Sequence, residues 1–238
     1  RLGFTDDPMP EIGRHYVTTP NVDHIVRLRK DPEFRAAYHQ ASLTLADGMP
    51  LVWASRLLGQ PLKERVAGSD LLPLVCQLAA EQGKTVFLLG GKLGVAEQAA
   101  LNLRRRFPSL RVVGTCAPPF RFETERIENH RTIQRINQAN PDVLFVGLGA
   151  PRQEKWVARH IDELKVKVAL CIGAGLDYAA GTAQRAPRWM QRGGLEWLWR
   201  LLQEPGRLWR RYLIQDMAFV PLFLKAWWHI RVTRGSRA

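Results

Sequence analysis

Carboxylate and amide side chains occur at several points where an apolar run of the chain ends and a glycine turn begins. Asp47 follows the strand predicted over residues 42–45, and Gln153 and Glu154 follow the glycine loop GLGAP. Asp177 follows a second glycine loop further along the chain. A carboxylate in such a place can remove a proton from a hydroxyl, and a glycine loop that opens a helix suits a nucleotide phosphate. These residue types predict loops that converge on one ligand-binding crevice.

The same side chains also fit ordinary structural positions, and the residues alone leave both interpretations open. Asp47 stands just before a helix predicted over residues 50–58, where an aspartate often caps the helix. Gln153 and Glu154 fall in the first turn of another predicted helix, where polar residues are commonly solvated.

Thr19 and Asn21 lie at the junction between a strand predicted over residues 16–21 and a helical stretch over residues 21–29. Either side chain is a good helix cap, because its oxygen can accept a hydrogen bond from a free backbone N–H group. Contact with a ligand is the alternative interpretation.

The elements that must position these residues alternate between strand and helix. Short runs of apolar, β-favouring residues predict strands over residues 16–21, 42–45, 85–89, 111–114, 142–146 and 166–172. Helical spacing predicts helices between them, over residues 21–29, 32–39, 50–58, 68–81 and 123–139. A further helix is predicted from the glycine loop at residues 90–94 to residue 106. This alternation predicts an α/β fold: a Rossmann-like core with a mainly parallel sheet flanked by helices.

Glycines at the ends of two predicted strands, Gly90, Gly91 and Gly149, could cradle a diphosphate. Their spacing is not GxGxxG, and no acidic residue ends the strand over residues 111–114 to hold a ribose, which disfavours a dinucleotide dehydrogenase. The sequence also lacks a DxD pair, a GxSxG elbow, a GxxxxGK[ST] loop and clustered His or Cys. We therefore expect neither a metal nor a cofactor.

Composition separates the C-terminal end from the rest of the 238-residue chain. Residues 185–238 hold eleven Lys and Arg against three acids, and six of the eight tryptophans. We expect a catalytic core over residues 1–184 and a basic, helical appendage over residues 185–238. Segments that combine cations with amphipathic rings bind either membrane surfaces or nucleic acids, and composition does not choose between them.

The cysteines are odd in number and widely spaced, at Cys76, Cys116 and Cys171. Their apolar surroundings suit reduced, buried thiols better than disulfides or a zinc site, which favours a cytosolic compartment.

Residues 213–230 contain the apolar stretch MAFVPLFLKAWWHI. Asp216, Pro221 and Lys225 interrupt it, and it falls short of the ~20 apolar residues that span a bilayer. Flanking arginines and a tryptophan pair fit a helix that lies in the interface of an anionic membrane. A helix packed on the core or on a second subunit is the alternative. The oligomeric state is therefore left open, with a homo-oligomer as one possibility.

Eight short motifs occur in one order along nearly the whole chain: TPN (19–21), ADG (46–48), AGSDL (67–71), FLLGG (87–91), VGLGAPRQE (146–154), GAGLDYAAG (173–181), RAP.W (185–189) and GLEWLWRLLQEPGRLWR (194–210). Together they resemble the WecG/TagA/CpsF glycosyltransferase family. The resemblance implies an inverting, metal-independent transfer of a sugar from a UDP-sugar to a polyprenyl-diphosphate-linked sugar. It places that transfer on the cytoplasmic face of the plasma membrane.

The resemblance also implies roles for individual residues. Asp47 resembles the family's catalytic base, and Thr19 and Asn21 resemble its neighbours in the acceptor and donor pocket. Gln153 matches the family's pocket glutamine, and Asp177 resembles the acidic residue near the nucleotide. Glycines at the strand ends and Glu154 are expected beside them in the donor pocket.

Three arginines match those of a family appendage that closes over the donor diphosphate: Arg200, Arg207 and Arg210. On a continuous helix they would share one face, although Pro205 is expected to break that helix. One departure from the family pattern is Met49-Pro50 after the ADG motif, which affects the expected shape of the acceptor pocket.

Two other function classes remain as alternatives. A non-catalytic nucleotide-sugar sensor would keep the pocket loops without using Asp47 as a base. A nucleic-acid-binding protein would explain the net charge of +13, but the sequence has no recognisable recognition helix or RNP motif, so we expect no nucleic-acid partner. The identities of the donated sugar and of the acceptor sugar are left open.

Overall fold

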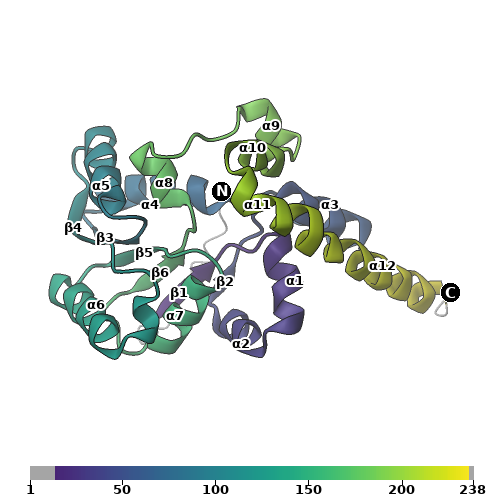
Figure 1. The fold of residues 1–238 in the computed structure, drawn as a ribbon, viewed down its shortest axis with the longest axis horizontal. Coiled ribbons are helices and arrows are strands. Elements are labelled where there is room, and N and C mark those ends of the chain that lie inside the picture. The colour runs from purple at the N-terminus through teal and green to yellow at the C-terminus, as the bar shows by residue number, and fades with distance from the viewer. Residues whose placement is uncertain (1–13, 236–238) are drawn as a thin grey trace.

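A parallel sheet runs through the centre of the protein, and helices cover both of its faces (Figure 1). The structure is a computed structural model and describes residues 14–235, except the side chains of Arg207 and residues 233–235. Within that part of the chain the sheet has six strands in the order β2-β1-β6-β5-β3-β4, and every neighbouring pair is parallel. The strands are β1 (His15–Thr18), β2 (Leu43–Thr44), β3 (Thr85–Gly90), β4 (Arg111–Cys116), β5 (Val143–Gly147) and β6 (Val168–Cys171). The predicted α/β class and parallel sheet are confirmed.

Alternating side chains along the strands build two hydrophobic layers. Val86 and Leu88 of β3 face one layer, and Phe87 and Leu89 face the other. The first layer is covered by α4 (Gly68–Glu81), α5 (Val95–Arg106) and α8 (Gly175–Ala180). The second is covered by α6 (Arg126–Ala139) and α7 (Arg152–His160). Because both faces are covered, the strands read as nearly continuous apolar runs.

Several predicted bounds shift by a few residues. The strand expected over residues 16–21 ends at Thr18, because the chain turns there toward the cap of the next helix. β2 is only two residues long, since it lies at the edge of the sheet and pairs with β1 alone. The helix expected from residue 123 begins at Arg126, because a 3₁₀ turn, η1 (Phe122–Thr124), comes first.

The order of the strands creates a topological switch point. From β3 the chain moves outward to β4, whereas from β5 it moves the opposite way to β6. Open α/β sheets bind ligands in a crevice at the carboxyl ends of the strands beside such a point. We therefore expect the ligand site at the ends of β3 and β5. Glycine loops occupy both positions.

Three helices surround the β1–β2 end of the sheet: α1 (Val22–Lys30), α2 (Pro32–Gln40) and α3 (Met49–Leu57). Asp31 caps α2, because its Oδ1 accepts a hydrogen bond from the backbone N–H of Phe34 at 3.0 Å. α2 packs against α7. α3 begins directly after the ADG motif.

The C-terminal part of the chain is helical and crosses back over α1 (Figure 1). It consists of α9 (Arg188–Arg192), α10 (Glu196–Gln203), α11 (Pro205–Arg210), a π-helical turn η2 (Arg211–Gln215), a 3₁₀ turn η3 (Asp216–Ala218) and α12 (Phe219–Gly235). The break expected at Pro205 is confirmed, and Arg200 therefore sits on a different helix from Arg207 and Arg210. In Figure 1, α12 projects away from the sheet.

None of the helices within residues 14–235 combines the length and the apolar character needed to cross a bilayer. The three cysteines are buried and free, as expected from their spacing.

Candidate active site

Asp47 lies in the loop between β2 and α3, beside the TPN motif. Its backbone N–H donates to the carbonyl oxygen of Pro20 at 2.7 Å, which ties the ADG loop to the end of β1. The N-cap position of α3 is Gly48, whose φ of 133° puts its backbone in a region that other residues rarely adopt. Asp47 therefore does not cap α3, and the capping interpretation is wrong.

The environment of Asp47 favours its protonated form. Burial raises the pKa of its carboxyl to about 7, and the negative charge of Glu196 adds to this, although Arg65, Arg200 and Arg185 oppose it. A carboxyl with a pKa near neutrality can accept a proton during a reaction and release it afterwards. This is the behaviour expected of a general base.

A cluster of ion pairs borders Asp47 and joins four separate parts of the chain. Arg65, just before α4, pairs with Glu196 of α10 at 2.6 Å and with Asp70 of α4 at 3.2 Å. Arg185, after α8, donates from Nη2 to Asp70 at 2.7 Å and lies 3.7 Å from Glu196. The cluster thus attaches α10 to the core beside the proposed base.

Arg200 of α10 lies within electrostatic range of the same group. Burial alone would lower the pKa of Arg200, but Tyr212, Tyr178, Asp47 and Glu196 together raise it. Its guanidinium therefore stays charged in a half-buried place beside Asp47. Of the three arginines predicted for diphosphate binding, this is the one that the structure brings to the base.

Sequence reasoning missed four members of this cluster: Arg65, Asp70, Arg185 and Glu196. Asp70, Arg185 and Glu196 lie inside the AGSDL, RAP.W and GLEWLWR motifs, and Arg65 lies two residues before the first of these. A search for charged residues within or beside the motifs would have found all four.

Gln153 joins two glycine loops at the switch point. Its Oε1 accepts from the backbone N–H groups of Gly149 and Gly173, each at 3.2 Å. Its Nε2 donates to Oε1 of Glu154 at 2.7 Å. Gln153 and Glu154 are 2 % and 0 % exposed, so the interpretation as solvated helix-start residues is wrong. Gln153 fixes the loop that follows β5 against the loop that follows β6.

Glu154 is a buried carboxyl with one unused oxygen. Burial raises the pKa of Glu154 to about 7, although the hydrogen bond from Gln153 opposes this. Its Oε2 is buried and has no hydrogen-bond partner among the residues that the structure describes. Through Oε1 it sets the orientation of the Gln153 amide, so its geometric role here is to position Gln153.

We expect Gln153→Leu to weaken UDP binding by at least ~10-fold, because binding loops must be held by supporting side chains to keep their geometry. The change leaves two loop N–H groups without their acceptor, so the free energy of unfolding should also fall by about 1–3 kcal/mol. Calorimetric titration with UDP and thermal unfolding check both effects. Gln77→Leu is the control, because Gln77 is exposed on α4 and its side-chain amide donates to Glu81. Unchanged UDP affinity in Gln153→Leu would contradict the loop-pinning role.

The side chains of Thr19 and Asn21 have structural partners. Thr19 is buried, and its hydroxyl donates to the carbonyl oxygen of Cys171 at 3.0 Å, which links the end of β1 to β6. Asn21 caps α1, because its Oδ1 accepts from the backbone N–H of His24 at 3.4 Å. The capping interpretation is confirmed for Asn21. Contact of either residue with substrate stays a prediction.

Gly90 lies where the carboxyl ends of β3 and β5 approach each other so closely that no larger residue fits. Its φ is +119°, and a Cβ atom there would lie 2.4 Å from the carbonyl oxygen of Gly147. The backbone N–H of Gly91 donates to that same carbonyl at 3.1 Å. Gly149 also has a positive φ, of +78°, but faces open space. Gly90 therefore lets the carboxyl ends of β3 and β5 approach each other closely, and contact of the glycines with a diphosphate stays a prediction.

The remaining predicted site residues lie on the helices around this crevice. Asp177 is half-buried in the first turn of α8, and its carbonyl accepts from the backbone N–H and hydroxyl of Thr182. Arg210 is exposed at the end of α11. The side chain of Arg207 lies outside the described residues. The structure thus brings Asp47 and Arg200 together, and leaves the Arg207 and Arg210 predictions untested.

The sequence pattern of the WecG/TagA/CpsF glycosyl transferase family matches residues 6–233 of the chain. The protein belongs to this family. The predicted family membership is thereby confirmed, and with it the assignment of the protein as a glycosyltransferase. The crevice at the switch point and the Asp47 cluster are therefore features of a family member, and not of a dinucleotide dehydrogenase or a nucleic-acid-binding protein.

Three curated relatives of this family member share the name N-acetylglucosaminyldiphosphoundecaprenol N-acetyl-β-D-mannosaminyltransferase. The relative from Bacillus spizizenii is 31 % identical over 199 residues, which cover 83 % of this chain and 74 % of the relative. The relative from Staphylococcus aureus (strain MRSA252) is 30 % identical over 209 residues, covering 88 % and 78 %. The relative from Bacillus subtilis is 29 % identical over 198 residues, covering 83 % and 74 %. The name of these relatives states the transferred sugar and a lipid-diphosphate acceptor.

Proposed function

We propose that this family member transfers an N-acetylhexosaminyl group, with N-acetylmannosamine as the first candidate, from a UDP-sugar to N-acetylglucosamine linked to a polyprenyl diphosphate. The observation that carries the proposal is the environment of Asp47. Its pKa is raised to about 7 in the presence of three nearby arginines, in a family member whose relatives are named for such a transfer.

In this mechanism Asp47 acts as the general base. Its carboxylate takes the proton of an acceptor hydroxyl while that oxygen attacks the anomeric carbon of the donor sugar. The bond from the anomeric carbon to the diphosphate breaks, and its electron pair leaves with UDP. Attack from the face opposite to the leaving group inverts the anomeric configuration. The proton remains on Asp47 until it is released to solvent.

Arginines stabilise the leaving UDP as its negative charge grows. Arg200 is suited to this, because it is half-buried, stays charged and lies in electrostatic range of Asp47. A guanidinium can contact two diphosphate oxygens at once. Arg207 and Arg210 would add to this charge from the next helix, α11, and Gln153 would keep the donor loops in place.

The C-terminal helices would seat the enzyme on the cytoplasmic face of the plasma membrane, where a polyprenyl-linked acceptor is anchored. Large apolar side chains are exposed along this segment, at Leu213, Ile214, Met217, Leu224 and Trp228. The +8 charge of residues 185–238 complements anionic lipid headgroups. Exposed apolar residues combined with basic charge are typical of peripheral membrane contacts.

The proposal is tested by incubating the purified protein with a set of UDP-sugars and a synthetic N-acetylglucosaminyl-diphospho-lipid. We expect a disaccharide product only with a UDP-N-acetylhexosamine, and nuclear magnetic resonance of that product should show inversion at the anomeric carbon. Retention of configuration would contradict the base role of Asp47. UDP binding without any transfer to the lipid acceptor would instead favour a nucleotide-sugar sensor.

Turnover is expected to survive a chelator, because arginines and not a divalent cation are proposed to meet the diphosphate. The measurement compares initial rates with and without excess EDTA, after dialysis against the chelator. We expect the two rates to agree within about two-fold, well below the 10²–10³-fold loss typical when a key stabiliser of transition-state charge is removed. Loss of activity in EDTA that Mg²⁺ or Mn²⁺ restores would overturn this part of the mechanism.

A further inference from the structure

An ion pair between a half-buried arginine and a buried aspartate attaches the C-terminal helices to α1. Nη2 of Arg211, the first residue of the π-helical turn η2, lies 3.2 Å from Oδ2 of Asp23. The same nitrogen donates to Oδ1 of Asn21 at 3.4 Å. Asp23 is only 2 % exposed, and Nε of Arg27 contacts both of its oxygens at 2.8 Å. One appendage side chain thus reaches the cap and the first turn of α1.

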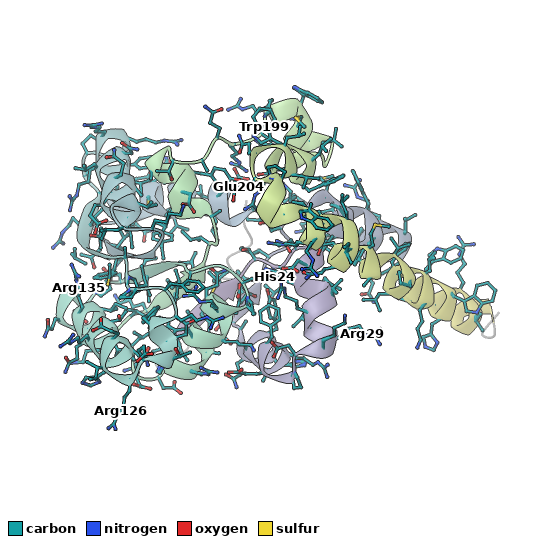
Figure 2. All side chains as sticks on the ribbon, viewed as in Figure 1. His24, Arg29, Arg126, Arg135, Trp199 and Glu204 are labelled. Carbon is teal, nitrogen blue, oxygen red and sulfur yellow. The ribbon has the colours of Figure 1, made fainter. Side chains whose placement is uncertain are left out.

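These contacts are connected to the proposed base, Asp47, through a single residue, Pro20. Asn21 directly follows Pro20, whose carbonyl accepts the backbone N–H of Asp47. Arg211 itself follows α11, the helix that carries Arg210, and α10 with Arg200 precedes α11. In Figure 2, His24 marks the part of α1 over which the C-terminal helices cross, and Glu204 marks the junction of α10 and α11. Arg211 therefore joins the segment bearing the arginines to Asn21, the residue after Pro20, which holds the loop bearing the base.

The attachment has features of a contact that can open. Nε of Arg211 and Oδ1 of Asp216 are buried without a hydrogen-bond partner among residues 14–235. A buried polar atom without a partner costs free energy, so the seated state is less stable than a fully satisfied interface would be. The turn that holds Arg211 is π-helical, a geometry that is rare and often found at functional sites.

We propose that the ion pair between Asp23 and Arg211 is a latch that seats the C-terminal helices on α1 and, together with the ion pairs of Glu196, holds Arg200 near Asp47 for donor binding. The inference rests on the proposed function, because it concerns the donor of that same transfer. Arg211 acts through the position of Arg200 and is a positioning residue. It is distinct from Arg200, Arg207 and Arg210, which are predicted to meet the diphosphate.

Arg211→Met is expected to raise the KM for the UDP-sugar by about 10-fold, with kcat changed by less than about three-fold. Without the latch, only a fraction of the molecules has the C-terminal helices seated on α1, and the apparent donor affinity is reduced in proportion to that fraction. Saturating donor restores the seated state, so kcat is nearly preserved. A general loss of folded protein would lower kcat and leave KM unchanged. Arg211→Lys keeps the charge next to Asp23 and should recover most of the affinity.

Two comparisons make the test specific. Arg131→Met removes an ion-paired charge from α6, where Arg131 lies 2.7 Å from Glu128, and should leave the donor KM unchanged. Asp23→Asn combined with Arg211→Met should be no weaker than the worse single variant, because both changes break the same contact. Effects that multiply in the double variant, or an equal KM shift in Arg131→Met, would overturn the latch.

Hydrogen exchange gives a readout that does not depend on turnover. Without substrate, backbone amides of residues 205–218 should exchange faster in Arg211→Met than in the wild type, while those of β3 and β5 should not change. Unchanged exchange in residues 205–218 would refute the latch. If the wild type transfers no sugar at all, the proposed function fails, and the exchange measurement still decides whether Arg211 seats the helices.

Discussion

Asp47→Asn is expected to lower kcat by at least ~10²-fold, the usual scale for removal of a general base, while UDP binding stays within a few-fold. The amide keeps the size of the carboxyl but cannot take the proton of the acceptor hydroxyl. Initial rates on the lipid-linked acceptor and calorimetric titration with UDP give the two quantities. Asp162→Asn, an exposed aspartate in the turn before β6, is the matched control. A stable variant with a near-normal rate would refute the base assignment.

The pH dependence of the wild type should identify the same group. Asp47 must be deprotonated to act as a base, so kcat/KM should rise with pH and reach half of its plateau near the raised pKa of about 7. The folded pKa of Asp47 is above its ordinary 3.8. This carboxyl therefore binds its proton more tightly in the folded state, and its contribution to stability falls as pH rises from about 4 to 7.

Asp47→Asn should consequently be at least as stable as the wild type at pH 8, because it removes a charge that burial and Glu196 disfavour. Thermal unfolding of both proteins at this pH checks the expectation. A variant that melts well below the wild type would show that Asp47 serves the fold, and its lower rate would then not identify a base.

Truncation after Trp189 is expected to leave a folded α/β core that no longer transfers sugar. Both hydrophobic layers of the sheet, as far as the structure describes them, are built from residues that precede residue 181. The deletion removes Arg200 and Glu196, which border Asp47, together with Arg207 and Arg210. Circular dichroism, cooperative unfolding and a transfer assay with a soluble, short-chain acceptor test this. Full activity of the truncated core on that acceptor would show that the arginines are not needed.

A longer variant, truncated after Tyr212, separates the two expected roles of the C-terminal helices. It keeps Arg200, Arg210 and the latch residue Arg211, but loses η3, α12 and most of η2. We expect it to lose binding to anionic vesicles and to retain partial transfer to the soluble acceptor. If it still sediments with such vesicles as the intact protein does, the membrane contact lies elsewhere in the chain.

Local sequence patterns predicted most of the secondary structure of this protein. The helix over Gly68–Glu81 has the predicted bounds, and β3 and β5 lie within one residue of theirs. These predictions succeed because side-chain periodicity and glycine or proline positions act over a few neighbouring residues. The short motifs also predicted the family, because eight matches in the same order along the chain are far more specific than any one of them.

The burial of Gln153 and Glu154 was decided by the tertiary structure. Polar residues in the first turn of a helix are usually solvated, and nothing nearby in the chain indicates otherwise. They are buried because the loop after β6, about twenty residues further along, lies against the loop after β5 and presents its N–H group to Gln153. That contact exists only once the two strands are neighbours.

The charge environment of Asp47 likewise depends on the fold. The sequence placed a carboxylate after a strand, which fits a cap as well as a base. Its raised pKa comes from burial and from Glu196, and Arg65 pairs with Glu196 across 131 positions of the chain. Ion pairs at such separation depend on strand order and on the return of the C-terminal helices to the core across α1. Local periodicity carries no information about either, because it reports only which side of an element is buried and not what packs against it.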